Sequence, residues 1–196
     1  MRCALAIAGV IGICACGGQQ SADGVSGRNT PMPATAQPAV QDARGEDAAI
    51  LRIQAHQAQI EQEASGYRCR TLELQGFADL GGTVEACYAG NALRRLSATY
   101  LGESGRGTEQ FVFRGDSLEF LLRKSEQYSE PLSGTVVSTD EDRFYWSDGR
   151  LIRWVSRSKT QPLNSLDARQ HERTARETAR KLAVCAARLV STVCVG

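Results

Sequence analysis

Few side chains in this sequence have the type and spacing that enzyme chemistry needs. The two histidines, His56 and His171, could act as bases or metal ligands, but neither belongs to an HExxH motif, and we expect both on the surface. Ser104 lies in the glycine-rich stretch 102–107, which has neither a GxSxG pattern nor the Gly-Lys-Ser/Thr ending of a phosphate loop. We interpret the stretch as a hairpin loop.

The acidic residues form no recognisable site either. The run 140–142 has three consecutive carboxylates, whereas Ca²⁺ needs spaced oxygen ligands, so we expect a solvated loop there. Four other acids could pair in space as glycosidase carboxylates do: Glu85, Glu103, Glu109 and Glu119. Pairing in space leaves no mark in the sequence, and the polar faces of sheets routinely carry such residues. The sequence therefore predicts no catalytic residue, no metal and no cofactor.

The composition is that of a globular chain with balanced charge. Of 196 residues, 42% are hydrophobic and 23% are charged. Residues 1–15 contain one basic residue, Arg2, so removing them leaves 22 of 23 basic residues against 22 acidic ones. A nucleic-acid binder would normally carry a strong basic surplus, so we expect no nucleic-acid partner.

The first residues form a short apolar run. The run 3–16 is shorter than the roughly 20 apolar residues of a membrane span, but it has the length of a secretory signal core. It ends in Ile13-Cys14-Ala15-Cys16, which resembles the lipobox of bacterial lipoproteins. That pattern has an aliphatic residue three places before the modified cysteine and a small residue directly before it.

The resemblance implies that the signal peptide 1–15 is removed and that Cys16 carries a diacylglycerol, usually with a third acyl chain on its amine. Each buried CH₂ contributes about 0.8 kcal/mol, so more than one chain anchors a protein stably. Gly17 follows Cys16, rather than the aspartate that retains lipoproteins in the inner membrane of enterobacteria-like systems. We therefore expect a lipid-anchored envelope protein on the outer membrane, facing the periplasm.

Four cysteines remain after Cys16, namely Cys69, Cys87, Cys185 and Cys194. An even number outside the cytoplasm favours disulfides, and four cysteines allow three pairings. We favour Cys69–Cys87 with Cys185–Cys194. The second pair requires the last helix to end near Val190, because a helix running through both would separate them by about 13 Å. The alternative is that some of the four are buried thiols.

Two segments precede the predicted sheet. Residues 16–45 contain several prolines and no periodic apolar residues, so we expect the lipidated cysteine to be followed by a disordered tether. Residues 46–64 place apolar side chains at helical spacing, with acids in the first turn. This pattern predicts a helix that stops before Ser65-Gly66.

Residues 67–155 change to an alternating pattern of apolar and polar side chains. The segments 88–93, 113–118 and 146–151 share one template: an aromatic residue, four residues containing Gly with Asn or Asp, then leucine. Turn residues of this kind predict β-hairpins. Three hairpins give about six antiparallel strands in a meander, with one apolar face that needs a cover.

The cover predicted by the sequence is a helix over 166–190 with an apolar stripe, capped by Asn164 or Ser165. The predicted fold class is therefore α+β, an antiparallel β-meander packed with an N-terminal and a C-terminal helix. We expect these elements to form a single domain over 46–196.

Part of the predicted sheet resembles a group of small exported bacterial proteins of unknown function, whose strands end in aromatic-x-x-x-Gly-x-Leu turns. The likeness rests on 81–88, 100–105 and 143–154, and it spans about residues 67–155. It implies the β-meander. It transfers no site residue, because the group has no established activity.

These observations predict a non-catalytic binding or interaction module, held at a membrane by the lipid on Cys16. Its expected partner is an envelope protein or a cell-wall component, and its candidate interaction loop is Ser104-Gly105-Arg106. The alternative is an inhibitor of an envelope-acting enzyme such as lysozyme. Membrane-bound lysozyme inhibitors are similar small, lipidated β proteins with disulfides. The Tyr67-Arg68-Cys69 opening, and the Ser104-Gly105 loop before an aromatic-Gly strand, are loosely similar to theirs.

Overall fold

The structure is a computed structural model that describes residues 38–188 and 192–196, with side chains from residue 44 onward. The described residues all fall into one compact unit, 36–196. The predicted signal peptide, Cys16 with its lipid, and the tether up to residue 37 lie outside the described residues.

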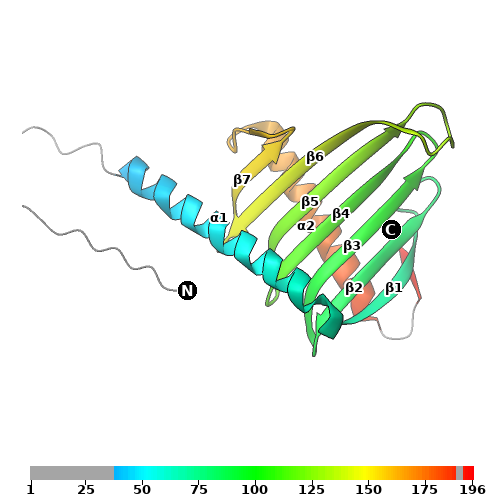
Figure 1. The fold of residues 1–196 in the computed structure, drawn as a ribbon, viewed down its shortest axis with the longest axis horizontal. Helices are drawn as coiled ribbons and strands as arrows, with labels where there is room; N and C mark the ends of the chain where they lie inside the picture. Colours follow the sequence, from blue (N-terminus) through cyan, green and yellow to red (C-terminus); the bar gives the residue numbers. More distant parts are fainter. Residues whose placement is uncertain (1–37, 189–191) are drawn as a thin grey trace, which may run out of the picture. The chain divides into compact units, whose positions relative to one another are not determined.

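The described residues form two α-helices, one short 3-10 helix and nine strands (Figure 1). In chain order they are α1 (Pro38–Glu63), η1 (Ala64–Gly66), β1 (Arg68–Gln75), β2 (Gly82–Ala89), β3 (Ala92–Gly102), β4 (Gly105–Arg114), β5 (Ser117–Tyr128), β6 (Val136–Ser147), β7 (Arg150–Ser156), β8 (Lys159–Thr160), α2 (Leu166–Ala187) and β9 (Val193–Val195).

All nine strands belong to one sheet, in the order β8-β7-β6-β5-β4-β3-β2-β1-β9. From β1 to β8 each strand pairs with the next in an antiparallel manner, so this part is the predicted meander. The three predicted hairpins are confirmed as β2–β3, β4–β5 and β6–β7. β9 returns from the end of the chain and pairs in parallel with Glu73–Gln75 of β1.

The prediction of about six strands is too low, because β1, β8 and β9 were not included. β8 has two residues and β9 has three, which is too short for an alternating pattern to show. β1 begins with Arg68-Cys69-Arg70, and only Leu72 and Leu74 are buried, so the apolar alternation covers only part of the strand. The α+β class and the two flanking helices are confirmed.

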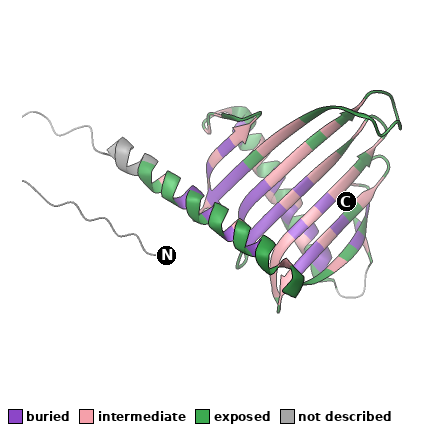
Figure 2. Cartoon of the chain, viewed as in Figure 1, coloured by how far each residue is buried: buried purple, intermediate pink, exposed green. Residues whose placement is uncertain are grey.

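The helices cover opposite faces of the sheet (Figures 1 and 2). The core under α1 contains, from the sheet, Val112, Phe120, Tyr145 and Ile152. The core under α2 contains, among others, Phe111, Leu121, Phe144 and Trp146. Consecutive residues of a strand point to opposite faces, so these adjacent positions enter different cores. The sheet thus has two apolar faces, where the sequence predicted one.

α1 begins at Pro38 rather than at residue 46. Proline fits the first turn of a helix, because the N–H that it lacks would have no partner inside the helix there. Residues 38–45 therefore belong to the helix and not to the predicted tether. The helix ends at Glu63, directly before the predicted stop.

α2 begins after Ser165, whose Oγ accepts a hydrogen bond from the backbone N–H of Ala168 at 3.0 Å. This confirms one of the two predicted caps. The helix ends at Ala187, and the chain folds back so that Cys194 on β9 bonds to Cys185 on α2.

Alanine makes up much of the α2 surface that meets the sheet. Ala168, Ala175, Ala179 and Ala186 are each at most 3% exposed. Small side chains let a helix backbone lie close to the large aromatic residues of the sheet, and such a tightly packed contact has no room for added volume.

We expect Ala175→Leu to lower the free energy of unfolding by about 1–3 kcal/mol, because the extra methylenes do not fit in the packed core. Urea denaturation followed by circular dichroism measures the change. Ala187→Leu, at the exposed end of the same helix, is the matched control and should change stability by less than about 0.5 kcal/mol. Equal stabilities of the two variants would contradict close packing at Ala175.

Candidate functional site

A groove opens between α1 and the turns of two hairpins, and we call it the α1 groove. Its volume is about 620 Å³. The turns of a meander fall alternately at the two ends of the sheet, so the β4–β5 and β6–β7 turns share one end, and α1 crosses that end (Figure 1). The polar lining residues are Arg52, His56 and Gln59 from α1, Arg114, Ser117 and Glu119 from the β4–β5 hairpin, and Ser147 and Asp148 from the β6–β7 turn.

A buried charged network forms the inner wall of the α1 groove. Nδ1 of His56 lies 2.5 Å from Oε2 of Glu119, and Nε of Arg114 donates to the other oxygen, Oε1, at 2.7 Å. His56 and Glu119 are 8% and 9% exposed, whereas the side chain of Arg114 is 54% exposed. Both oxygens of Glu119 thus have partners, which a buried carboxylate requires.

The prediction that His56 lies on the surface is wrong. His56 follows Ile53 by three residues and precedes Ile60 by four, so all three share the buried stripe of α1. This spacing is the signal in the sequence that identifies His56 as buried. Glu119, which lies 63 residues away in the chain, supplies the partner that makes the burial tolerable.

Two arginines at the α1 groove have unused hydrogen-bond donors. Arg114 uses Nε for Glu119, and Arg52 uses Nε for the backbone oxygen of Ala48 at 3.4 Å. Within the described part of the chain, the terminal nitrogens of both guanidinium groups make no hydrogen bond. A planar guanidinium matches the geometry of carboxylates and phosphates. The groove can therefore hold an acidic group.

A histidine held by a carboxylate is also the arrangement of a general base. The His56 ring, however, has Glu119 as its only hydrogen-bond partner among the described residues. In that part of the chain, the ring makes no hydrogen bond to a serine hydroxyl or to a cysteine thiol. His56 therefore lacks the geometry that activates a nucleophile.

A second buried carboxylate, Glu109, lies on the α2 face of the sheet and is 7% exposed. Oε2 of Glu109 accepts from the Tyr100 hydroxyl at 2.9 Å, and Oε1 accepts from Nε of Arg123 at 2.7 Å. Nη1 of Arg123 lies 3.5 Å from Nδ1 of His171. The His171 ring is half-buried against Trp154, with ring centroids 4.8 Å apart, so its predicted exposure is also wrong.

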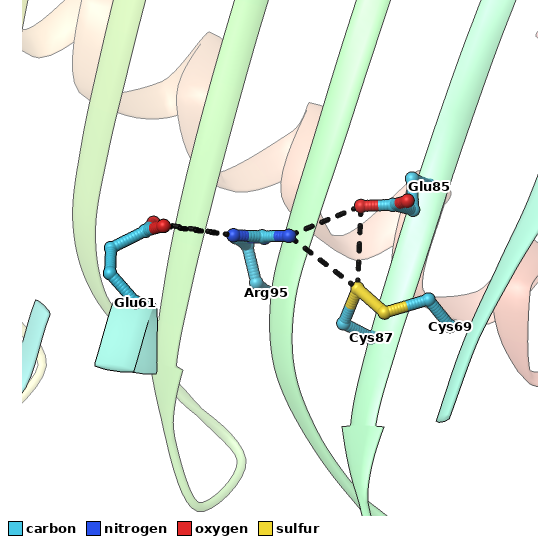
Figure 3. The surroundings of a disulfide bond; sticks show 5 residues. All are labelled: Glu61, Cys69, Glu85, Cys87 and Arg95. Atoms are coloured by element: carbon cyan, nitrogen blue, oxygen red, sulfur yellow. Dashed lines mark hydrogen bonds and ion pairs between the residues drawn. A yellow bond between two sulfur atoms is a disulfide. The ribbon is translucent and has the colours of Figure 1, made fainter. Parts of the chain in front are cut away.

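The four carboxylates that could have formed a glycosidase pair are not brought together. Glu119 lies on the α1 face of the sheet and Glu109 on the opposite face. Glu85 accepts from Arg95 at 3.2 Å, beside a disulfide (Figure 3). Glu103 lies in the turn between β3 and β4. The structure therefore offers no two of these carboxylates to one substrate.

The acidic run 140–142 lies in strand β6 and not in the predicted solvated loop. Its partners are Arg157 for Asp140, Lys124 and Arg143 for Glu141, and the indole N–H of Trp154 for Asp142. The run belongs to a strand because the alternation of the pleat gives each acid a partner on its own face.

The candidate interaction loop Ser104-Gly105-Arg106 forms the β3–β4 turn and the start of β4. The serine carbonyl accepts from the backbone N–H of Tyr128 at 2.9 Å, and the arginine pairs with Glu126 at 2.6 Å. A Cβ on the glycine would lie 2.1 Å from the backbone oxygen of Glu126, so only glycine fits. The turn is thus exposed at the serine and held firmly by its neighbours.

Both predicted disulfides are present. Cys69–Cys87 joins β1 to β2, and Cys185–Cys194 joins α2 to β9. In the described residues, Cys69, Glu85 and Cys87 also form the one cluster whose donor atoms lie close enough to share a metal ion. A disulfide carries no thiolate for a metal to bind, so the cluster cannot act as such a site while the bond is intact.

No family model, no curated protein and no solved structure matches this chain. Function therefore has to be argued from the geometry and chemistry of the sites. Neither helix in the described part of the chain combines the length and the apolar character that a membrane span requires.

Tyr100 allows the Glu109 network to be tested through pH. Burial, and then the charge of Glu109, raise the pKa of the Tyr100 hydroxyl well above its usual range. In the unfolded chain the hydroxyl ionises near pH 10, while the folded protein keeps its proton. The unfolded state therefore binds fewer protons above about pH 10, and the stability that Tyr100 contributes falls as the pH rises further.

We expect Tyr100→Phe to cost about 1–2 kcal/mol near neutral pH, because Glu109 loses a buried hydrogen bond, and to cost less at about pH 11. Urea denaturation of both proteins at the two pH values gives the loss of unfolding free energy at each pH. Tyr128→Phe is the control, because the Tyr128 hydroxyl has no hydrogen-bond partner among the described residues. A Tyr100→Phe penalty that stays constant between the two pH values would argue against the raised pKa.

Proposed function

We propose that this protein is a lipid-anchored, non-catalytic binding module of the bacterial cell envelope, and that the α1 groove binds an acidic envelope component. The observation that carries the proposal is the pair of arginines, Arg52 and Arg114, which line the groove with unused donors. The lipid on Cys16 would hold the domain at the outer membrane, facing the periplasm. There it meets both envelope proteins and the cell wall.

The charges of the groove favour a ligand with an acidic group and several neutral polar groups. Arg52 and Arg114 bring two positive charges, and Glu119 and Asp148 bring two negative ones. Glu119 is already occupied by His56 and Arg114, so an acidic group beside the two arginines would use donors that are otherwise unpaired. Hydroxyl or amide groups of the ligand would suit the remaining lining. Cell-wall sugar–peptides combine carboxylates, hydroxyls and amides in this way.

We expect a soluble form that begins at Gly17 to co-sediment with purified peptidoglycan sacculi. Arg52→Gln should weaken this binding about tenfold, because one charged hydrogen bond contributes roughly 1.4 kcal/mol or more. Arg114→Gln should weaken it at least as much. Arg52→Gln is the cleaner variant, because it leaves the pairs of Glu119 intact.

The matched control is Arg173→Gln, which removes the same charge from an exposed position of α2 on the other side of the sheet. Circular dichroism should show unchanged folding for Arg52→Gln and Arg173→Gln. An equal loss of binding in Arg173→Gln would mean attraction by overall charge only. Failure of the unchanged protein to bind sacculi would remove the cell wall as the ligand of the groove.

A second candidate function, inhibition of an envelope-acting enzyme such as lysozyme, is favoured by the firmly held β3–β4 turn. A loop that already has its bound conformation loses little entropy on entering an active site. The exposed Ser104 lies in this turn. Its backbone oxygen accepts from the N–H of Tyr128, and the backbone oxygen of Glu103 accepts from the N–H of Leu132, so these two hydrogen bonds hold the turn in place.

This second function predicts that the soluble form slows the lysis of cell walls by lysozyme and that Ser104→Arg abolishes the effect. Asn91→Arg, in the exposed β2–β3 turn at the opposite end of the sheet, should leave inhibition unchanged. A turbidity assay of lysis measures both. Lysis at full rate with a molar excess of the protein rules out inhibition of lysozyme.

A further inference from the structure

The two disulfides differ in the exposure of their cysteine residues. Cys69 is exposed, whereas Cys87 is fully buried. The two residues lie opposite each other on β1 and β2 (Figure 3). Cys185 and Cys194 are 8% and 0% exposed and lie in the core under α2. An external thiolate can reach a disulfide that has one exposed residue, whereas a buried disulfide reacts only after local opening.

The buried sulfur of Cys87 lies beside a cation. Arg95 is opposite Cys87 on β3, and its Nη2 lies 3.8 Å from Sγ of Cys87 and 3.2 Å from Oε1 of Glu85. Its Nη1 donates to both oxygens of Glu61 on α1, at 3.2 and 3.3 Å (Figure 3). Two carboxylates thus hold the guanidinium next to the sulfur. A neighbouring cation stabilises a thiolate, so Cys87 is the better leaving group of the pair.

The negative charge of Glu85 disfavours a thiolate on Cys87, so the positive charge of Arg95 is needed to offset it. Oε1 of Glu85 lies 3.4 Å from Sγ of Cys87, and a disulfide sulfur has no hydrogen to donate to it. Without Arg95, the charge of this carboxylate would disfavour a thiolate on Cys87. The guanidinium donates to Glu85 and lies beside the sulfur, so its positive charge offsets that of the carboxylate.

The strand pairing leaves Cys69 at an edge of the sheet. β9 pairs with Glu73–Gln75 only, which is the far end of β1, and no strand among the described residues pairs with the Cys69 end on that side. The disulfide runs from β2 to β1. A thiolate that attacks Cys69 in line with the leaving sulfur therefore approaches from the side of β1 where no described strand is paired, and not through the sheet.

We propose that Cys69–Cys87 is a thiol–disulfide exchange site for a protein dithiol, and that Cys185–Cys194 is a structural bond. One thiolate of the dithiol attacks Sγ of Cys69 and forms a mixed disulfide. The bond to Cys87 breaks, and Cys87 leaves as a thiolate beside Arg95 and then takes up a proton.

The second thiol of the partner then attacks the sulfur of the partner's first cysteine, which is bonded to Cys69 in the mixed disulfide. This step releases Cys69 as a thiol and closes the partner's disulfide. Two electrons and two protons pass to this protein, and the reverse sequence restores its bond. This exchange is independent of the ligand proposed for the α1 groove.

The decisive experiment traps the mixed disulfide. The oxidised protein is incubated with a thioredoxin-class oxidoreductase whose CxxC motif is changed to CxxS, so that the second step cannot occur, and the product is mapped by mass spectrometry. We expect the partner on Cys69, free Cys87 and an intact Cys185–Cys194. A partner on Cys87, Cys185 or Cys194, or no trapped complex, would overturn the proposal.

The role of Arg95 is tested by the rate at which dithiothreitol opens each disulfide in the folded protein. Cys69–Cys87 should open at least about tenfold faster than Cys185–Cys194, which is the internal control. Arg95→Gln should slow the opening of Cys69–Cys87 about threefold or more, and Arg95→Lys should restore much of the rate. Arg94→Gln removes the same charge from the adjacent position on β3 and should have little effect.

The same measurement also reports a loss of folding. An Arg95→Gln variant that opens both disulfides faster has a loosened fold. The opening rate of Cys69–Cys87 in the Arg95→Lys variant then decides whether the positive charge at this position matters. Equal rates for the two disulfides in the unchanged protein, or a rate for Cys69–Cys87 that is the same in Arg95→Gln and Arg94→Gln with folding intact, would each contradict the proposal.

Discussion

Between β4 and β7 the strands carry large apolar side chains at consecutive positions, such as Phe111 with Val112 and Phe144 with Tyr145. Consecutive residues of a strand point to opposite faces, so both faces of the sheet must be removed from water. A meander cannot do this by itself, because it forms a single layer. Two helices are therefore required, and the chain supplies one before the sheet and one after it. The α1 groove and the disulfide between α2 and β9 both depend on these helices.

Burial on two faces also explains why polar side chains lie inside the protein as paired groups. Glu119 is bonded to His56 and Arg114 on one face, and Glu109 is bonded to Tyr100 and Arg123 on the other. Burying a charge without partners costs several kcal/mol, so each network has to be complete. A complete network adds little net stability, but it allows only one arrangement of the groups that share it. The networks therefore act mainly to specify how the elements fit together.

The parts of the fold that follow from local chemistry could be predicted from the sequence. Turn residues predicted three hairpins, and the period of the apolar residues predicted both helices. The even cysteine count predicted disulfides, and the favoured one of the three possible pairings is the one present. The groove could not be predicted in this way, because it depends on a contact between α1 and β5 across 63 residues of sequence. His56 was the one member with a local signal, its spacing from Ile53 and Ile60.

One helix connects the two proposed sites. Polar contacts at three points along α1 tie it to four strands: Asp47 to Arg153 of β7, His56 to Glu119 of β5, and Glu61 to both Gln110 of β4 and Arg95 of β3. Contacts at three points along a helix fix both its rotation and its position across a sheet. A groove whose wall is fixed in this way needs little rearrangement to bind a ligand, which reduces the entropy lost on binding. The last of the three contacts also holds the guanidinium beside Cys87, so the same packing that shapes the groove determines the electrostatic surroundings of the exposed disulfide.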